Sequence, residues 1–117
     1  MSDELFDVNK LSEQCGGSNA VVMMVLEEFQ NQTPIDVSGI DTALQAGDVD
    51  AASKVAHSLK GASGTMGAMM LHGLSAEVEA ACRHDKDIEK ANSLFPKLKE
   101  VAQQTLDAIP TVMAKFS

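Results

Sequence analysis

Apolar residues recur along most of this chain at spacings of three and four positions, as they do on the buried face of an α-helix. Two clear stripes are Leu71, Leu74, Val78, Ala81 and Cys82, and Leu94, Leu98, Val101, Thr105 and Ile109. Ala, Leu, Met, Glu, Lys and Gln dominate the chain, and these residues favour helices. The pattern therefore predicts helices over about 4–14, 19–31, 34–46, 48–65, 68–83 and 87–115.

Capping residues and glycines mark where these helices begin and end. Ser18 follows two glycines and is suited to cap a helix. Gly47 followed by Asp48 predicts the end of one helix and the cap of the next. Thr33 before Pro34 predicts another helix start, because proline is favoured at the first helical position.

Two further prolines lie in the last predicted helix. We expect Pro96 to kink this helix or to mark its true start, and Pro110 to bend or fray its end. The connections between helices are short, so neighbouring helices run antiparallel and the predicted fold is an all-α up-down bundle. With no internal repeat and no long linker, residues 1–117 are expected to form one domain.

The segment 48–67 carries an unusual polar face. Its apolar residues share one side of the predicted helix: Ala52, Val55, Leu59, Ala62 and Met66. His57 points away from that side, together with Ser53, Lys60, Gly61 and Gly64. Glycine inside a helix costs about 1 kcal/mol relative to alanine, and core packing gives no reason for it on this face. We therefore expect a partner to come close to the backbone at Gly61 and Gly64.

An exposed imidazole beside a lysine suits phosphoryl transfer. A neutral imidazole is a nucleophile at cellular pH, and His57 can carry a phosphoryl group on nitrogen. Lys60, one turn further on, supplies positive charge for the phosphoryl oxygens. No catalytic triad or second histidine at metal-ligand spacing accompanies His57, so neither hydrolysis nor a metal site is indicated. Residues 61–67 match neither glycine-rich nucleotide motif, so we expect no ATP-dependent kinase activity.

Charge and composition narrow the possible partners. Nine Lys and Arg against seventeen Asp and Glu give a formal charge of −8, which argues against nucleic acid as a ligand. No apolar run approaches the roughly 18 residues of a membrane span, and the first ten residues do not resemble a signal peptide. We expect a cytoplasmic protein with Cys15 and Cys82 as reduced, structural thiols.

The chain resembles the histidine-containing phosphotransfer (HPt) domains of bacterial and eukaryotic phosphorelays. The core of the resemblance is His57-Ser58-Leu59-Lys60-Gly61, followed by Ser63 and Gly67. The flanking segments that also look like the family are Leu26 to Phe29, Ile40 to Asp48, Ala56, and Leu74 to Glu79. The similarity therefore covers nearly the whole chain.

The resemblance implies an antiparallel four-helix bundle with an additional N-terminal helix. It implies that His57 is the phosphoacceptor, that Lys60 contacts the phosphoryl oxygens, and that Gly61 gives clearance for a docking receiver domain. It assigns Ser63 and Gly67 to helix packing and termination. Some family members have Gln where this chain has Glu79, and the resemblance implies that this position faces the neighbourhood of His57. A carboxylate cannot donate a hydrogen bond to phosphate, so the role of Glu79 stays open.

The function expected from this resemblance is that of a phosphocarrier, not an enzyme. The expected partners are response-regulator receiver domains, a hybrid sensor kinase, or both, and the expected state is a monomer. We expect no cofactor on this chain, because the receiver brings the Mg²⁺. The alternative is a helical protein-interaction module that is never phosphorylated. A metal-binding bundle would need Glu-x-x-His pairs on facing helices, and the sequence has none.

Two methionines and two histidines are less informative. Met23 and Met24 lie on the side of their helix away from its core stripe, where they are either covered by the 4–14 helix or form a docking patch. His72 and His84 are expected to be ordinary surface residues.

Overall fold

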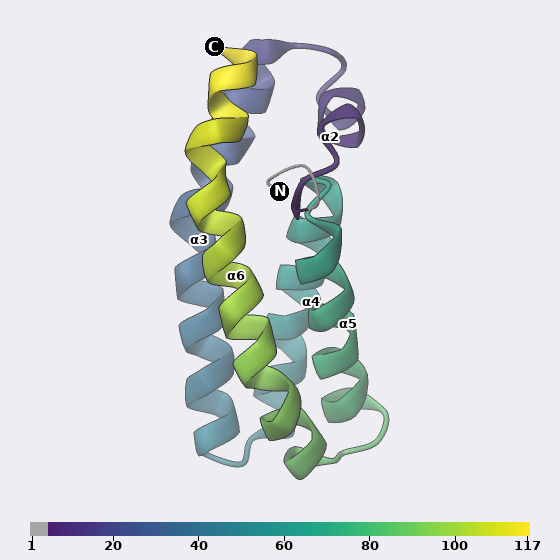
Figure 1. Ribbon diagram of the computed structural model, residues 1–117. Helices are drawn as coiled ribbons and strands as arrows, with labels where there is room; N and C mark the ends of the chain where they lie inside the picture. Colours follow the sequence, from purple (N-terminus) through teal and green to yellow (C-terminus); the bar gives the residue numbers. More distant parts are fainter. Residues whose placement is uncertain (1–4) are drawn as a thin grey trace.

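The computed structural model of this chain describes residues 5–117, and every element in that range is a helix. The helices are α2 (Val8–Gln14), α3 (Asn19–Gln45), α4 (Val49–Thr65), α5 (Met69–Arg83) and α6 (Ile88–Phe116). The four long helices run alternately up and down (Figure 1), and each packs against two others, in the cyclic order α3, α4, α5, α6. The predicted all-α antiparallel bundle with an extra N-terminal helix is confirmed.

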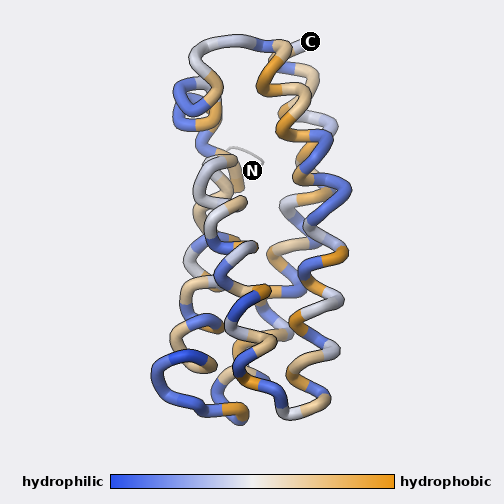
Figure 2. Tube along the Cα trace, turned by 180° about the vertical axis from the view of Figure 1, so that it is seen from behind, coloured by the Kyte–Doolittle hydropathy of each residue, from blue (hydrophilic) through white to orange (hydrophobic). Residues whose placement is uncertain are grey.

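The core is built from one apolar face of each long helix. Figure 2 shows apolar and polar positions alternating along these helices, as a bundle with one buried face per helix requires. Most residues of the two predicted stripes are fully buried, while Leu74 and Leu94 pack against the core from its edge. None of the helices within residues 5–117 has the length and apolar character that a membrane span needs.

The helices expected over 19–31 and 34–46 are a single helix, α3. The predicted break at Thr33 and Pro34 is wrong, because Thr33 is buried at 1% exposure instead of capping a new helix. Proline inside a helix removes one backbone hydrogen bond and costs about 3 kcal/mol. Apolar residues on both sides of Pro34, including Phe29 and Ile40, are buried in the bundle core and offset this cost.

The last helix is likewise continuous through both of its prolines. It begins at Ile88, capped by the Asp87 side chain, which accepts a hydrogen bond from the Lys90 N–H at 3.0 Å. Pro96 therefore does not mark its start, and the helix continues past Pro110 to Phe116. The predicted caps at Ser18 and Asp48 are both confirmed by side-chain hydrogen bonds to the first turn.

Helix α2 and the residues before it close one end of the bundle. The first residue of the helix expected over 4–14 lies outside the described residues. Phe6 and Leu11 are buried, and the Phe6 ring meets the edge of the Phe29 ring at 6.4 Å between centroids. The Asp7 N–H donates to the Gly67 carbonyl at 2.7 Å. These contacts attach the N-terminal segment to both α3 and the turn after α4.

Gly67 is required for this attachment. Its φ of +73° lies in the left-handed region, and a Cβ there would come within 2.6 Å of the Asp7 carbonyl oxygen. We predict that Gly67→Ala lowers the free energy of unfolding by about 2–3 kcal/mol, measured by chemical denaturation. Gly47 is the matched control, since its φ is +70° but a Cβ would meet nothing within 4 Å. Equal losses in Gly67→Ala and Gly47→Ala would show that the close approach to Asp7 is unimportant.

Candidate functional site

Helix α4 presents His57 to solvent at the middle of its length. Ala52, Ala56 and Leu59 are buried on the core side of α4. The His57 side chain is 57% exposed on the opposite side. The orientation predicted for His57 from the helical period is therefore the orientation in the structure.

A buried carboxylate on α5 holds the His57 ring. Glu79, whose side chain is only 6% exposed, lies 2.8 Å through Oε2 from His57 Nδ1. Its Oε1 lies 2.6 Å from Lys60 Nζ, and its Oε2 lies 3.1 Å from Arg83 Nη1. One carboxylate thus connects His57 and Lys60 of α4 with Arg83 of α5.

The network keeps Glu79 ionised. Burial by itself raises the pKa of Glu79, but the hydrogen bonds from Lys60 and His57, together with the charge of Lys60 and that of the His57 ring in its protonated form, outweigh burial and hold this pKa below its ordinary value. An ionised carboxylate can only accept hydrogen bonds. The proton between the two side chains therefore belongs to His57 Nδ1.

This proton assignment fixes the chemistry of the neutral ring. An imidazole with its proton on Nδ1 has an unprotonated Nε2, which carries the reactive lone pair. Because Glu79 occupies the Nδ1 side and the ring is largely exposed, Nε2 is the nitrogen available to a partner. The site combines an exposed ring nitrogen, a nearby ammonium group and a fixed negative charge behind the ring.

The sequence leaves the role of Glu79 open, but it carries a signal that this carboxylate is paired with cations. Glu79 follows Val78 on the buried face of α5, between the buried Ser75 and Cys82. A carboxylate at such a position is almost always paired with cations. Its partners His57 and Lys60 lie 22 and 19 residues away, so helical spacing does not reveal them, although the family resemblance places this position facing the histidine.

The two glycines of the predicted strip have different surroundings. A Cβ on Gly61 would meet nothing within 4 Å, so its backbone is open. Gly64 is covered by His72, whose Nδ1 would lie 2.9 Å from an added Cβ. The expectation that Gly64 is bare backbone left for a partner is therefore wrong, because the neighbouring helix needs this space.

Two other residues also differ from the sequence expectation. Ser53 is buried at 4% exposure and therefore does not belong to the exposed strip. His72 is not an ordinary surface residue, since its Nδ1 donates to the Lys60 carbonyl at 2.8 Å. This bond ties α5 to α4 one turn from His57. The contact depends on the helix crossing and has no signature in the spacing of residues.

Ser63 and Gly67 occupy structural positions. Ser63 is fully buried, and its Oγ donates to the Leu59 carbonyl at 2.6 Å. Gly67 forms the left-handed turn that receives the N-terminal segment. Met24 is 68% exposed, so the α2 helix does not cover it, whereas Met23 is half-buried.

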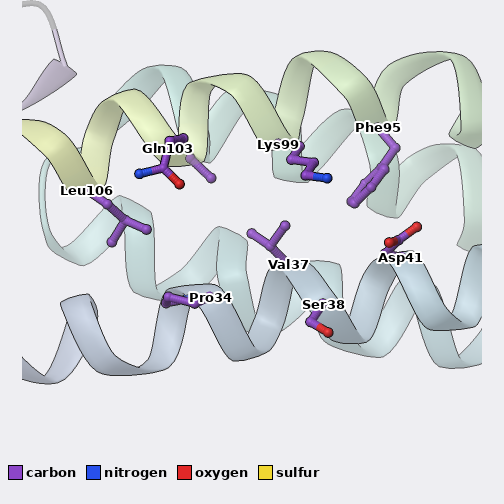
Figure 3. Close-up of a pocket in the computed structure, with 9 residues that line it drawn as sticks. Pro34, Val37, Ser38, Asp41, Phe95, Lys99, Gln103 and Leu106 are labelled. Carbon is purple, nitrogen blue, oxygen red and sulfur yellow. The ribbon is translucent and has the colours of Figure 1, made fainter.

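Two grooves flank α3 on opposite sides. A groove of about 230 Å³ lies between α3 and α4 and includes Gly61 in its lining. A second groove, of about 300 Å³, lies between α3 and α6, and Figure 3 shows Val37, Phe95 and Leu106 among its lining residues. The second groove takes no residue from α4 or α5 and is therefore remote from His57.

Within residues 5–117 there is no group of three His, Cys, Asp or Glu residues arranged to hold a metal ion.

The Glu79 network should stabilise the fold in a pH-dependent way. The pKa of Glu79 in the folded protein is below its ordinary value of 4.5. The contribution of Glu79 to the free energy of unfolding is therefore fully present above pH 4.5 and is lost as the pH falls through the pKa of the folded state. We predict that wild type exceeds Glu79→Gln in unfolding free energy by about 1–2 kcal/mol at pH 6, and that this difference shrinks towards pH 3. Glu77→Gln, at an exposed position of the same helix, is the control. A difference that stays constant from pH 6 to pH 3 would contradict the ionised network.

Comparisons with known proteins point to one family. Residues 24–109 match the model of the Hpt domain family. The phosphorelay intermediate protein rdeA of Dictyostelium discoideum is 25% identical over 99 residues, which are 85% of this chain and 39% of that protein. The chain thus spans well under half of that relative. The crystal structure of the HPT domain from the Hpt sensor hybrid histidine kinase of Shewanella matches with a TM-score of 0.85 and 20% identity over 96% of both chains.

The family model covers well over half of the chain, and the structural match gives the same helical fold. This chain therefore belongs to the Hpt domain family.

Proposed function

We propose that this chain is a phosphocarrier in a multistep phosphorelay, with His57 as its phosphoacceptor. The observation that carries the proposal is the exposed His57 ring, whose Nδ1 is bonded at 2.8 Å to the buried carboxylate of Glu79. This arrangement leaves Nε2 as a free nucleophile on the surface. Family membership and the similarity to a phosphorelay intermediate support the same function.

The proposed reaction transfers a phosphoryl group from an aspartyl phosphate of a receiver domain. His57 Nε2 attacks phosphorus in line, the N–P bond forms, and the bond to the aspartate oxygen breaks with its electron pair leaving on the carboxylate. The ring gains positive charge as the N–P bond forms, while its proton stays on Nδ1. Glu79 stabilises this charge, as a carboxylate behind a catalytic histidine does in hydrolases. The same steps in reverse deliver the group to another receiver.

Lys60 supplies the second electrostatic contribution. Its ammonium group is already 2.6 Å from Glu79 and is 31% exposed on the His57 side of the bundle. When a phosphoryl group is attached to Nε2, its oxygens offer Lys60 a second negative partner close to the first. In this proposal the Mg²⁺ and the aspartate chemistry belong to the receiver, and this chain contributes the nucleophile, the lysine and the open backbone at Gly61.

The first test is phosphate uptake. We predict that wild type, incubated with phosphorylated receiver domains and Mg²⁺, acquires acid-labile, base-stable phosphate, and that His57→Gln acquires none while keeping its helical circular dichroism. His84→Gln is the matched control, because His84 is exposed at the end of α5 and should leave uptake at the wild-type level.

Uptake by His57→Gln would assign the phosphate to another residue. If wild type took up nothing from several receivers or from a small phosphoramidate donor, the chain would be an interaction module that is never phosphorylated.

A second prediction concerns Lys60. Lys60→Ala should slow phosphoryl transfer by about tenfold, which corresponds to about 1.4 kcal/mol of lost transition-state stabilisation. Lys60→Arg keeps the positive charge and should recover most of the rate. Lys54→Ala removes an exposed lysine from the same helix outside the network and should have no effect. An undiminished rate in Lys60→Ala, measured by rapid quench, would remove Lys60 from the mechanism.

A further inference from the structure

The groove between α3 and α4 lies beside the proposed phosphoacceptor. It has a volume of about 230 Å³ and reaches α4 at Gly61, one helical turn from His57. Much of its lining is apolar: Val25, Phe29, Ala62 and Met66. A partner that covers His57 and the open backbone at Gly61 therefore also covers this groove.

The groove contains an unusual carboxylate. Asp36 lines it and is only 9% exposed. It accepts a hydrogen bond from the Gln32 amide at 3.0 Å, and no ion pair to Asp36 is found within residues 5–117. Glu28 adds a second negative charge, and no residue in the lining is a lysine or arginine. A buried carboxylate without a cation is unfavourable.

Asp36 differs from Glu79 in having no cationic partner in its own chain within residues 5–117. Asp36 and Glu79 are the two buried carboxylates of residues 5–117. Glu79 is surrounded by His57, Lys60 and Arg83 of its own chain. The side chain of Asp36 has only a neutral amide, that of Gln32, as its hydrogen-bond partner. The two carboxylates lie on opposite sides of α4, one satisfied internally and the other open to a cation from outside.

The position of Asp36 brings this charge close to the reacting group. Helices α3 and α4 run antiparallel (Figure 1), and Gly39 of α3 lies against Val55 of α4. Asp36 lies three residues before Gly39 on α3. Because the two helices are antiparallel, Asp36 is level with residues about three positions after Val55 on α4, in the turn that contains His57. The carboxylate therefore lies at the His57 end of the groove.

We propose that this groove binds one arginine or lysine side chain of the receiver domain that docks on His57. The inference rests on the proposed function and names a chemical feature of its partner. The apolar stem of the side chain lies against Phe29, Ala62 and Met66, as long cationic side chains do on apolar surfaces. Its charge lies beside Asp36, at the His57 end of the groove. A receiver with an acidic residue at this place is rejected, because two carboxylates would meet with no cation between them.

The test compares two aspartates of α3 that have the same local bonding. Asp36 accepts from Gln32 and Asp41 accepts from Gln45, both at 3.0 Å and four residues apart. Asp41 lines the groove between α3 and α6, away from His57. The probe is a receiver domain that exchanges phosphate with wild type in the uptake assay, and the small phosphoramidate is the donor that does not fill the groove.

We expect Asp36→Asn to lower kcat/KM for the receiver about tenfold and to weaken its dependence on salt concentration. Asp41→Asn should leave both at wild-type values. The loss in Asp36→Asn should appear with the receiver and not with the phosphoramidate. Thermal unfolding of Asp36→Asn should occur at no lower temperature than that of wild type, since the substitution removes an unpaired buried charge. Glu28→Gln removes an exposed charge two helical turns from Asp36 and should cause a smaller loss of kcat/KM.

Equal receiver kinetics in Asp36→Asn and Asp41→Asn would overturn the inference while leaving the proposed function intact. If Ala62→Met blocked transfer and Asp36→Asn did not, the groove would take an apolar side chain and the cation would be wrong. If wild type took phosphate from the phosphoramidate but exchanged it with no receiver, the inference would be overturned, because no receiver would dock on His57. No uptake from any donor would overturn the proposed function itself.

Discussion

The ion pair network around Glu79 is the interaction on which the site depends. Placing a carboxylate at 6% exposure between two helices is unfavourable unless several donors reach it. His57, Lys60 and Arg83 are those donors, and each is itself partly exposed at the surface. The same contacts that stabilise the buried charge therefore orient the imidazole and keep a lysine beside it. Stability and chemistry share one set of hydrogen bonds.

The bundle supports this network by fixing how α4 and α5 lie against each other. The turn between them is short and contains Gly67, whose carbonyl is bonded to the N-terminal segment at 2.7 Å. Beyond that turn, His72 fits over the bare backbone of Gly64 and bonds to the Lys60 carbonyl. These contacts set the height of α5 relative to α4. As a result, Glu79 arrives opposite His57 two turns further along.

Much of this structure could be predicted from the sequence because helices have a regular period. That period separates the buried Leu59 from the exposed His57, and it identifies Gly61 as open backbone. It cannot show contacts between helices, which depend on how two helices cross. The ion pairs of Glu79 and the contact of His72 with Gly64 belong to this class, although the family resemblance placed the position of Glu79 near the histidine. The predicted helix break at Thr33 and Pro34 was wrong for another reason. Local capping preferences favour a break there, but the packing of the 27-residue helix overrides them.

We infer that Glu79 fixes the proton of His57 on Nδ1 and leaves Nε2 free. Long-range proton–nitrogen NMR of the imidazole nitrogens, recorded on wild type at a pH where the ring is neutral, tests this claim directly. We predict that Nδ1 carries the proton and Nε2 is unprotonated, and that this preference is lost in Glu79→Gln. A neutral ring with its proton on Nε2 in wild type would contradict it.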